Sequence, residues 1–102
     1  MSEFVFAVKA EEIQAGQILA LNIDDTPIAF TRLDGRIVAF GDVCTHDDGP
    51  LAEGTLEGEC IVCPRHGAHF NLFTGKPTFP APFPITIYET KIEGDNILLK
   101  LT

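Results

Sequence analysis

Cys44-Thr45-His46 and Cys63-Pro64-Arg65-His66 are the two stretches of this sequence that decide its fold and its chemistry. Each stretch offers one thiolate and one imidazole, and sixteen residues separate the two stretches. Glycine follows each of them, at Gly49 and Gly67, so the backbone can turn sharply after both. The pattern therefore predicts two loops that grip one metal centre. The candidate ligands are Cys44, His46, Cys63 and His66.

This donor set leaves two kinds of centre open. Zinc accepts two thiolates and two imidazoles in a tetrahedral site, but zinc fingers commonly place both cysteines in one arm and both histidines in the other. Here each arm is mixed, which suits a two-iron cluster whose one iron takes both thiolates and whose other iron takes both imidazoles. Taken singly, each side chain would be interpreted as a buried cysteine or a hydrogen-bonded histidine. Four together favour the iron cluster, and a zinc-binding module with two cysteines and two histidines is the alternative.

Cys60 and His69 are further side chains of ligand type near these stretches. Cys60-Ile61-Val62-Cys63 is formally a C-x-x-C motif, which needs a tight turn to aim both sulfurs at one centre. The two residues between the cysteines are β-branched and favour an extended chain, in which residues three apart point to opposite faces. We therefore expect Cys60 to be a buried strand residue, and His69 to begin a strand beside the site without being a ligand.

Turn residues divide the chain into short segments rich in β-branched and aromatic residues, which predicts an all-β fold. Asp34-Gly35 suits a two-residue type I′ hairpin turn, and Gly94-Asp95 is expected to form the same turn nearer the C-terminus. Only residues 10–15 favour a helical turn, which Gly16 should end. The expected strands are Phe4 to Val8, Gln17 to Ile23, Pro27 to Arg32, Arg36 to Phe40, Ile61 to Val62, Ala68 to Phe73, Ile85 to Lys91 and Asn96 to Leu101.

The charge of the chain restricts its partners. The 102 residues carry 15 Asp and Glu against 7 Lys and Arg, a formal net charge of −8. Nucleic acid and anionic membranes are bound through clustered Lys and Arg, so neither is an expected partner, and a basic protein is. There is no basic leader, and no apolar stretch approaches the roughly 20 residues that span a bilayer, so we expect a cytoplasmic protein. No linker or repeat divides residues 1–102, which predicts a single domain.

Acidic residues concentrate next to the ligand stretches. Residues 42–59 contain no Lys or Arg. This segment is either a solvated loop or an acidic rim that steers basic partners towards the site in fast, salt-sensitive encounters. Its acidic residues are Asp42, Asp47, Asp48, Glu53, Glu57 and Glu59.

With these residues in view, the chain resembles the Rieske [2Fe-2S] family. The resemblance rests on Cys-Thr-His at 44–46 and Cys-Pro-Arg-His-Gly-Ala-His-Phe at 63–70, and it continues through Thr74-Gly75-Lys76 and the proline-rich residues 80–82. In length and layout the whole chain is similar to the small Rieske ferredoxins that serve bacterial ring-hydroxylating oxygenases. The resemblance implies one [2Fe-2S] cluster, with Cys44 and Cys63 on a buried iron and His46 and His66 on an outer iron near the surface.

The resemblance also implies an architecture. It consists of stacked antiparallel sheets with a small cluster-binding insertion, here about residues 43–73. A proline loop, here about residues 77–84, should pack beside the cluster. Pro80, Pro82 and Pro84 suit this role, because proline fixes φ and lacks an N–H, so the segment can lie against the site without joining a sheet.

Departures from the respiratory-chain branch of this family bear on the reduction potential. That branch has a disulfide between cysteines at the positions of Gly49 and Arg65, and it has a serine and a tyrosine at the positions of Ala68 and Phe70. Hydroxyl groups that donate to sulfur stabilise the reduced cluster, and this chain lacks them at both positions. We therefore expect a potential in the lower part of the Rieske range, roughly −150 to 0 mV.

The expected function is one-electron transfer by a carrier that is not itself an enzyme. The resemblance implies two transient partners, a flavoprotein ferredoxin reductase and a terminal ring-hydroxylating oxygenase, and we expect a monomer. An oxygenase needs a mononuclear iron held by two histidines and a carboxylate. Only His69 remains once His46 and His66 are committed to the cluster. A Rieske ferredoxin with another client, such as iron–sulfur assembly or another reductive pathway, is the alternative.

Overall fold

The computed structural model describes residues 4–45, 49–65, 67–79 and 81–101, and all regular structure in these residues is β-strand or 3₁₀ turn. This confirms the all-β prediction. None of the described residues belongs to a helix with the length and apolarity needed to cross a bilayer. The strands are β1 (Phe4–Lys9), β2 (Leu19–Ile23), β3 (Thr26–Leu33), β4 (Arg36–Gly41), β5 (Thr55–Glu57), β6 (Cys60–Val62), β7 (His69–Asn71), β8 (Ile87–Glu93) and β9 (Asn96–Lys100), and the 3₁₀ turns are η1 (Ala10–Glu12) and η2 (Leu51–Glu53).

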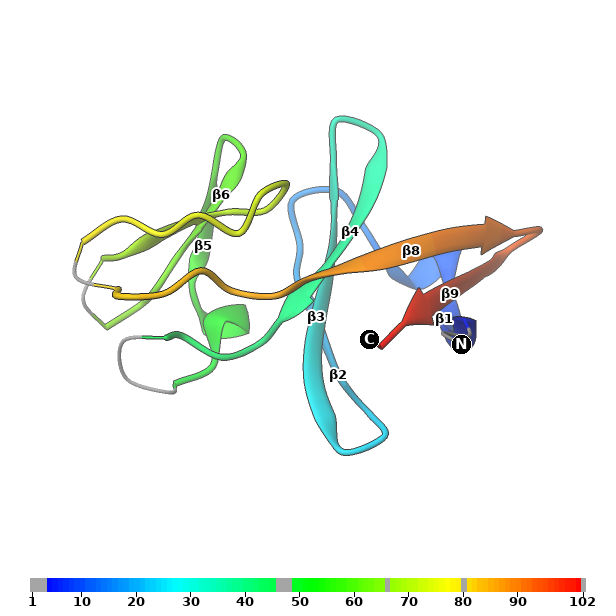
Figure 1. The fold of residues 1–102 in the computed structure, drawn as a ribbon. Coiled ribbons are helices and arrows are strands. Elements are labelled where there is room, and N and C mark those ends of the chain that lie inside the picture. The colour runs from blue at the N-terminus through cyan, green and yellow to red at the C-terminus, as the bar shows by residue number, and fades with distance from the viewer. Residues whose placement is uncertain (1–3, 46–48, 66, 80, 102) are drawn as a thin grey trace.

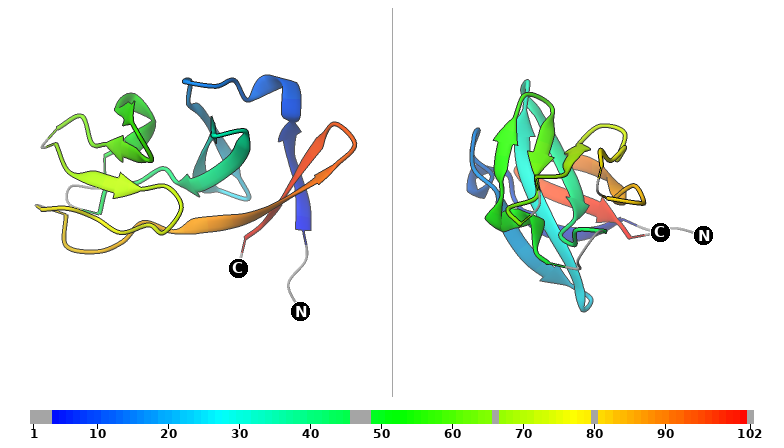
Figure 2. Two further views of the ribbon diagram at one scale, coloured as in Figure 1. Left: turned by 90° about the horizontal axis from the view of Figure 1, so that it is seen from above. Right: turned by 90° about the vertical axis from the view of Figure 1, so that its left-hand side faces the viewer.

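Two antiparallel sheets make up the fold (Figure 1). The larger sheet has six strands in the order β1-β9-β8-β4-β3-β2, and the smaller has the order β5-β6-β7. Strand β8 pairs with β9 only from Glu89 onwards, and its first two residues pair with β4, where Ala39 lies opposite Tyr88 and Phe40 lies opposite Ile87. The larger sheet is therefore divided into two halves, β1-β9-β8 and β4-β3-β2, whose strands cross in Figures 1 and 2.

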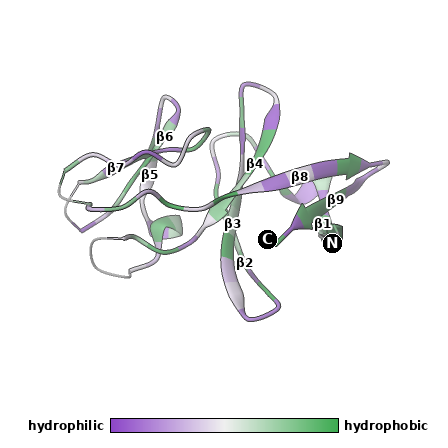
Figure 3. Cartoon of the chain, viewed as in Figure 1, coloured by the Kyte–Doolittle hydropathy of each residue, from purple (hydrophilic) through white to green (hydrophobic). Residues whose placement is uncertain are grey.

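Strands β3 and β4 form the centre of the molecule because both of their faces are buried. Phe30 packs with residues of β1 and β9 in one core, whereas Phe40 packs with residues of β6 and β7 in a second core. Successive side chains of a strand point to opposite faces, so residues 28–31 and 38–40 are buried without a break. Hydrophobic residues accordingly occur on the strands of both sheets (Figure 3). The β3–β4 hairpin is thus the layer against which the smaller sheet is seated.

Tight turns set the register of the larger sheet. Asp34 and Gly35 both have positive φ, at 51° and 76°, which confirms the type I′ turn between β3 and β4. At Gly94-Asp95 the hairpin turn is present but the predicted type was wrong: only the glycine has positive φ, at 61°, so the turn is of the type II′ kind. Asp24 and Asp25, with φ of 51° and 63°, form a further turn between β2 and β3 that the sequence did not reveal. Aspartate tolerates this left-handed backbone better than most residues.

Several predicted boundaries were wrong by one or more residues. The helical turn predicted over residues 10–15 is the single turn η1, which ends at Ile13 in an extended conformation instead of at Gly16. The strand predicted to run from Ala68 to Phe73 is shortened to β7 because the Asn71 side chain starts a turn. Its Oδ1 accepts hydrogen bonds from the amides of Phe73 and Thr74, at 2.8 and 3.1 Å. Strand β5 and turn η2 were not predicted, since three-residue elements carry little periodicity.

The smaller sheet lies at one end of the molecule, and β1 and β9 lie at the other (Figures 1 and 2). The molecule measures 38 × 29 × 19 Å along its principal axes. Residues near the smaller sheet are therefore far from residues on β1.

Candidate metal centre

Cys44 and Cys63 begin two turns that are built in the same way. The amide of Cys44 donates to the carbonyl oxygen of Gly49 at 2.8 Å, and the amide of Cys63 donates to that of Ala68 at 2.8 Å. The amide of each cysteine is thus hydrogen-bonded to the carbonyl oxygen of the residue five positions later. Both side chains are buried, with 0% and 3% exposure, and both belong to the core beneath the smaller sheet. The two cysteine turns, residues 44–49 and 63–68, therefore bring two soft sulfur donors from separate parts of the chain into one dry region.

The predicted ligands His46 and His66 lie outside the described residues, as do Asp47 and Asp48. In the sequence, each histidine falls within one of the two cysteine turns. Within residues 4–45, 49–65, 67–79 and 81–101, no three His, Cys, Asp or Glu side chains come together as a metal site. The set of four ligands therefore stays a prediction. Its described members, the two buried cysteines, fit an iron–sulfur centre or a zinc centre.

Asp42 connects the two ends of the segment that contains the first cysteine turn. Its carboxylate Oδ1 accepts a hydrogen bond from the amide of Ala52 at 2.7 Å, which joins the residue before the turn to η2 after it. Asp42 is only 9% exposed. Burial raises the pKa of its carboxyl, although the hydrogen bonds from the backbone of Ala52 and Leu51 oppose this shift. The assignment of Asp42 to an exposed acidic rim is therefore wrong, because its carboxylate is engaged inside the protein.

Three other residues of the predicted rim are exposed: Glu53, Glu57 and Glu59. The carboxylate of Glu57 lies 3.8 Å from Nε2 of His69, and Oε1 of Glu59 accepts a hydrogen bond from Asn71 Nδ2 at 3.3 Å. In the described residues the acidic rim thus consists of glutamates on and beside β5.

Cys60 and His69 occupy strand positions, as predicted. Cys60 begins β6, and it is half-buried rather than buried. Burial, followed by the charges of Glu59 and Glu57, raises the pKa of the Cys60 thiol. His69 begins β7, where its Nδ1 lies 3.1 Å from the carbonyl oxygen of Gly67 and its Nε2 faces Glu57. Cys60 thus stands outside the core that holds Cys44 and Cys63, and His69 has protein partners.

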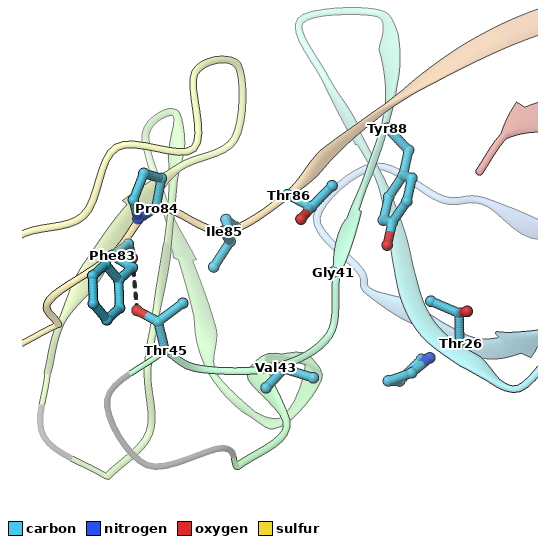
Figure 4. Close-up of a pocket in the computed structure, with 10 residues that line it drawn as sticks. Thr26, Gly41, Val43, Thr45, Phe83, Pro84, Ile85, Thr86 and Tyr88 are labelled. Carbon is cyan, nitrogen blue, oxygen red and sulfur yellow. Dashed lines mark hydrogen bonds between the residues drawn. The ribbon is translucent and has the colours of Figure 1, made fainter. Parts of the chain in front are cut away.

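The segment 77–84, the predicted proline loop, is tied to both cysteine turns. Oγ1 of Thr45 donates to the carbonyl oxygen of Phe83 at 2.6 Å (Figure 4). Thr78 binds His69 twice: its amide donates to the His69 carbonyl oxygen, and its Oγ1 accepts from the His69 amide, both at 2.8 Å. Pro80 lies outside the described residues. The described part of the segment is therefore hydrogen-bonded to residues at both cysteine turns. The sequence predicted this position of the loop only through the family resemblance.

A groove of about 480 Å³ lies between this segment and the larger sheet (Figure 4). Thr45 and Phe83 line it on one side, and Gly41 and Tyr88 line it on the other. None of the described residues that line it is His, Cys, Asp, Glu, Lys or Arg. The described lining therefore offers hydroxyl groups, such as those of Thr45 and Tyr88, and no carboxylate, amine or imidazole.

Comparison with known proteins agrees with this arrangement. Residues 3–89 match the family model described as Rieske [2Fe-2S] domain. The ferredoxin component of the naphthalene 1,2-dioxygenase system of Pseudomonas aeruginosa is 32% identical over 101 residues, which cover 98% of this chain and 97% of that protein.

Solved structures show the same fold. The ferredoxin of Sphingomonas yanoikuyae B1 superimposes with a TM-score of 0.91 and 25% identity, over 98% of this chain and 100% of that one. A chain from the complex of reduced oxygenase and oxidized ferredoxin in carbazole 1,9a-dioxygenase gives a TM-score of 0.86 and 32% identity, over 95% of this chain and 92% of that one. The predicted stacked antiparallel sheets with a small inserted sheet are thereby confirmed.

Proposed function

Because this chain belongs to the Rieske [2Fe-2S] domain family, we propose that it is the ferredoxin of an aromatic ring-hydroxylating dioxygenase system. It is an electron carrier and not an enzyme. The observation that carries the proposal is the similarity to a dioxygenase ferredoxin component over nearly the full length of both chains. An oxygenase that contains a Rieske domain is longer than its Rieske domain, so this chain would match only part of such a protein.

In this proposal Cys44, His46, Cys63 and His66 hold one Rieske-type [2Fe-2S] cluster. Burial of Cys44 and Cys63 in one core supports the sulfur half of this set. The family match decides against the zinc module that the sequence had left open. When bound, the cluster supplies the one-electron redox chemistry. The chain is proposed to form a single domain over residues 1–102, with residues 43–73 as the insertion that binds the cluster and 77–84 as the proline loop.

The described residues that share a core with the two cysteines are apolar and exclude water. Ala68 and Phe70 are fully buried, and neither has a hydroxyl that can donate to sulfur. Fewer donors leave the electron-rich reduced state less stabilised. This supports a midpoint potential in the lower part of the Rieske range, roughly −150 to 0 mV.

The proposed partners are a flavoprotein reductase that donates the electron and a terminal oxygenase that accepts it. A carrier must leave one partner before it meets the next, so both contacts are transient. The chain is further proposed to act as a monomer in the cytoplasm. The exposed carboxylates of Glu53, Glu57 and Glu59, with the net charge of −8, support attraction of basic surfaces.

Spectroscopy, a redox titration and reconstituted turnover at two salt concentrations test this function. The iron-loaded protein should absorb in the visible, give a reduced-state EPR signal with average g below 2, and titrate between roughly −150 and 0 mV. It should also restore turnover when added to a flavoprotein reductase, NADH and the oxygenase of the naphthalene or carbazole dioxygenase system. A colourless zinc protein, or a midpoint above about +200 mV, would contradict the proposal. Electron delivery that is the same at low and high salt would contradict the steering role of the acidic residues.

A further inference from the structure

Two phenylalanine side chains project from the proline loop into solvent. Phe79 is 93% exposed and Phe83 is 66% exposed. Among the described residues only two other large hydrophobic side chains are exposed, Phe6 and Ile92, and they lie on β1 and β8. Single exposed hydrophobic residues are common on protein surfaces, but two aromatic rings in one short segment of the chain call for a reason.

The exposure is not that of a loose tail, because the backbone around both rings is anchored. The amide of Ala81 donates to the carbonyl oxygen of Thr78 at 3.0 Å, and the amide of Ile85 donates to that of Gly75 at 3.1 Å. Between these anchors Ala81 is only 8% exposed. The carbonyl of Phe83 accepts the hydrogen bond from Thr45. A segment held in this way has less backbone freedom to lose when its side chains are bound.

The anchors also place the two rings beside the cysteine turns. Phe79 follows Thr78, which is hydrogen-bonded to His69 next to the second cysteine turn. The carbonyl of Phe83 is hydrogen-bonded to Thr45 within the first cysteine turn. The segment lies at the end of the molecule that carries the smaller sheet, opposite β1 (Figures 1 and 2). Any protein that covers the two rings therefore comes close to the region where the cysteines are buried.

We propose that Phe79 and Phe83 are the apolar anchors by which this chain docks on its terminal oxygenase. The inference rests on the proposed function and names the residues that make the contact. Aromatic residues dominate the binding energy of protein interfaces when they fill pockets on the partner. Interfaces also place such an apolar centre within a polar rim. Here one acidic side chain lies on the same side: the exposed Glu57 faces His69, whose amide is hydrogen-bonded to Thr78, the residue before Phe79.

The two rings and the nearby acidic side chain define the partner surface that would fit them. It should offer a hydrophobic hollow for two phenyl rings, surrounded by basic side chains that complement the acidic surface. The oxygenase is favoured over the reductase because a chain of the same fold is known in complex with an oxygenase. Charge then controls how fast the proteins meet, whereas the rings control how long they stay together.

The test compares electron delivery by the iron-loaded wild-type chain with that by Phe79→Ala, Phe83→Ala and the double variant. The acceptor is the purified oxygenase of the carbazole or naphthalene dioxygenase system, whichever the wild-type chain reduces. Neither substitution removes a buried side chain, and Phe83→Ala keeps the carbonyl that binds Thr45. Phe6→Ala is the matched control, since Phe6 is 55% exposed on β1 at the other end of the molecule.

We expect each substitution to raise the KM for the ferredoxin at least about tenfold, a change worth about 1.4 kcal/mol. The midpoint potential and visible circular dichroism should not change, and leucine at both positions should restore most of the affinity. The dependence of KM on salt should keep its slope, because the lost contact is apolar. Phe6→Ala should behave as wild type.

Four results would overturn the inference. They are an unchanged KM in the double variant, an equal rise in KM for Phe6→Ala, a KM rise accompanied by a shifted potential or spectrum, and an equal loss of electron uptake from the reductase. The first of these, with an active wild-type chain, refutes the docking role alone. A wild-type chain that binds no iron–sulfur cluster, or that carries no electron from a flavoprotein reductase, refutes the proposed function and the docking role with it.

Discussion

Gly75 is the position where the structure predicts the largest effect from the smallest substitution. Its φ is +82°, and a Cβ built there would overlap the carbonyl oxygen of Ile85. Its amide donates to the carbonyl of Asn71 at 2.7 Å, and its carbonyl accepts from the amide of Ile85 at 3.1 Å. Gly75 thus joins the turn after β7 to the end of the proline loop, and Gly75→Ala perturbs both.

The magnitude follows from three contributions. Left-handed backbone costs an alanine about 1–2 kcal/mol. Relief of the overlap moves Ile85 and breaks a hydrogen bond worth about 1 kcal/mol. Ile85 is only 6% exposed, and part of its burial energy of about 1.5–3 kcal/mol is lost when it moves. Gly75→Ala should therefore destabilise the protein by about 3–5 kcal/mol.

Gly35→Ala is the control that separates strain from overlap. Gly35 has a similar φ of +76°, but no described atom lies within 4 Å of a Cβ built there. Only the backbone strain of about 1–2 kcal/mol applies to it. For a domain of this size, 1 kcal/mol lowers the Tm by about 4–8 °C, so Gly75→Ala should lower it by at least about 12 °C and by clearly more than Gly35→Ala.

The assay is thermal unfolding of the iron-loaded proteins at one fixed scan rate, followed by far-ultraviolet circular dichroism and by the visible absorbance of the cluster. A fixed rate keeps the variants comparable, because the Tm of a protein that unfolds irreversibly depends on the scan rate. Both signals should fall at lower temperature in Gly75→Ala. Equal Tm shifts for the two variants would refute the argument from the Ile85 carbonyl.

Three further predictions concern the metal centre. Cys63→Ser should abolish the visible absorbance of the iron-loaded protein, whereas Cys60→Ser and His69→Ala should retain it; cluster loss in either of the latter two would refute the proposed ligand set. Because burial, Glu59 and Glu57 raise the pKa of Cys60, its alkylation by iodoacetamide in the folded protein should begin at higher pH than that of an unfolded-chain thiol, and a double Glu57→Gln, Glu59→Gln variant should react at lower pH. An unchanged pH profile would show that these carboxylates do not act on the thiol. Phe70→Tyr should raise the midpoint potential in a redox titration, by about 59 mV if its hydroxyl favours the reduced state by about 1.4 kcal/mol, and a lower potential would contradict the argument from missing donors.

Local sequence predicted those features whose physical cause is local. The type I′ turn at Asp34-Gly35 follows from the backbone needs of two adjacent residues, and His69 begins a strand as its neighbours indicated. Boundaries failed where a side chain competed with the sheet for backbone groups, as Asn71 does after β7. The role of Asp42 was missed because its partner, Ala52, is ten positions away and offers only a backbone amide.

The sequence by itself determined the class of fold, the identity of the candidate ligands and the family. Turn chemistry and the spacing of thiolates and imidazoles are encoded in neighbouring residues, so they can be seen without coordinates. Tertiary structure alone decided that the Asp42 carboxylate is buried, that Thr45 and Thr78 tie the proline loop to both cysteine turns, and that Phe79 and Phe83 face solvent. Burial and hydrogen bonding between distant segments depend on how the two sheets pack, and no local pattern records that packing.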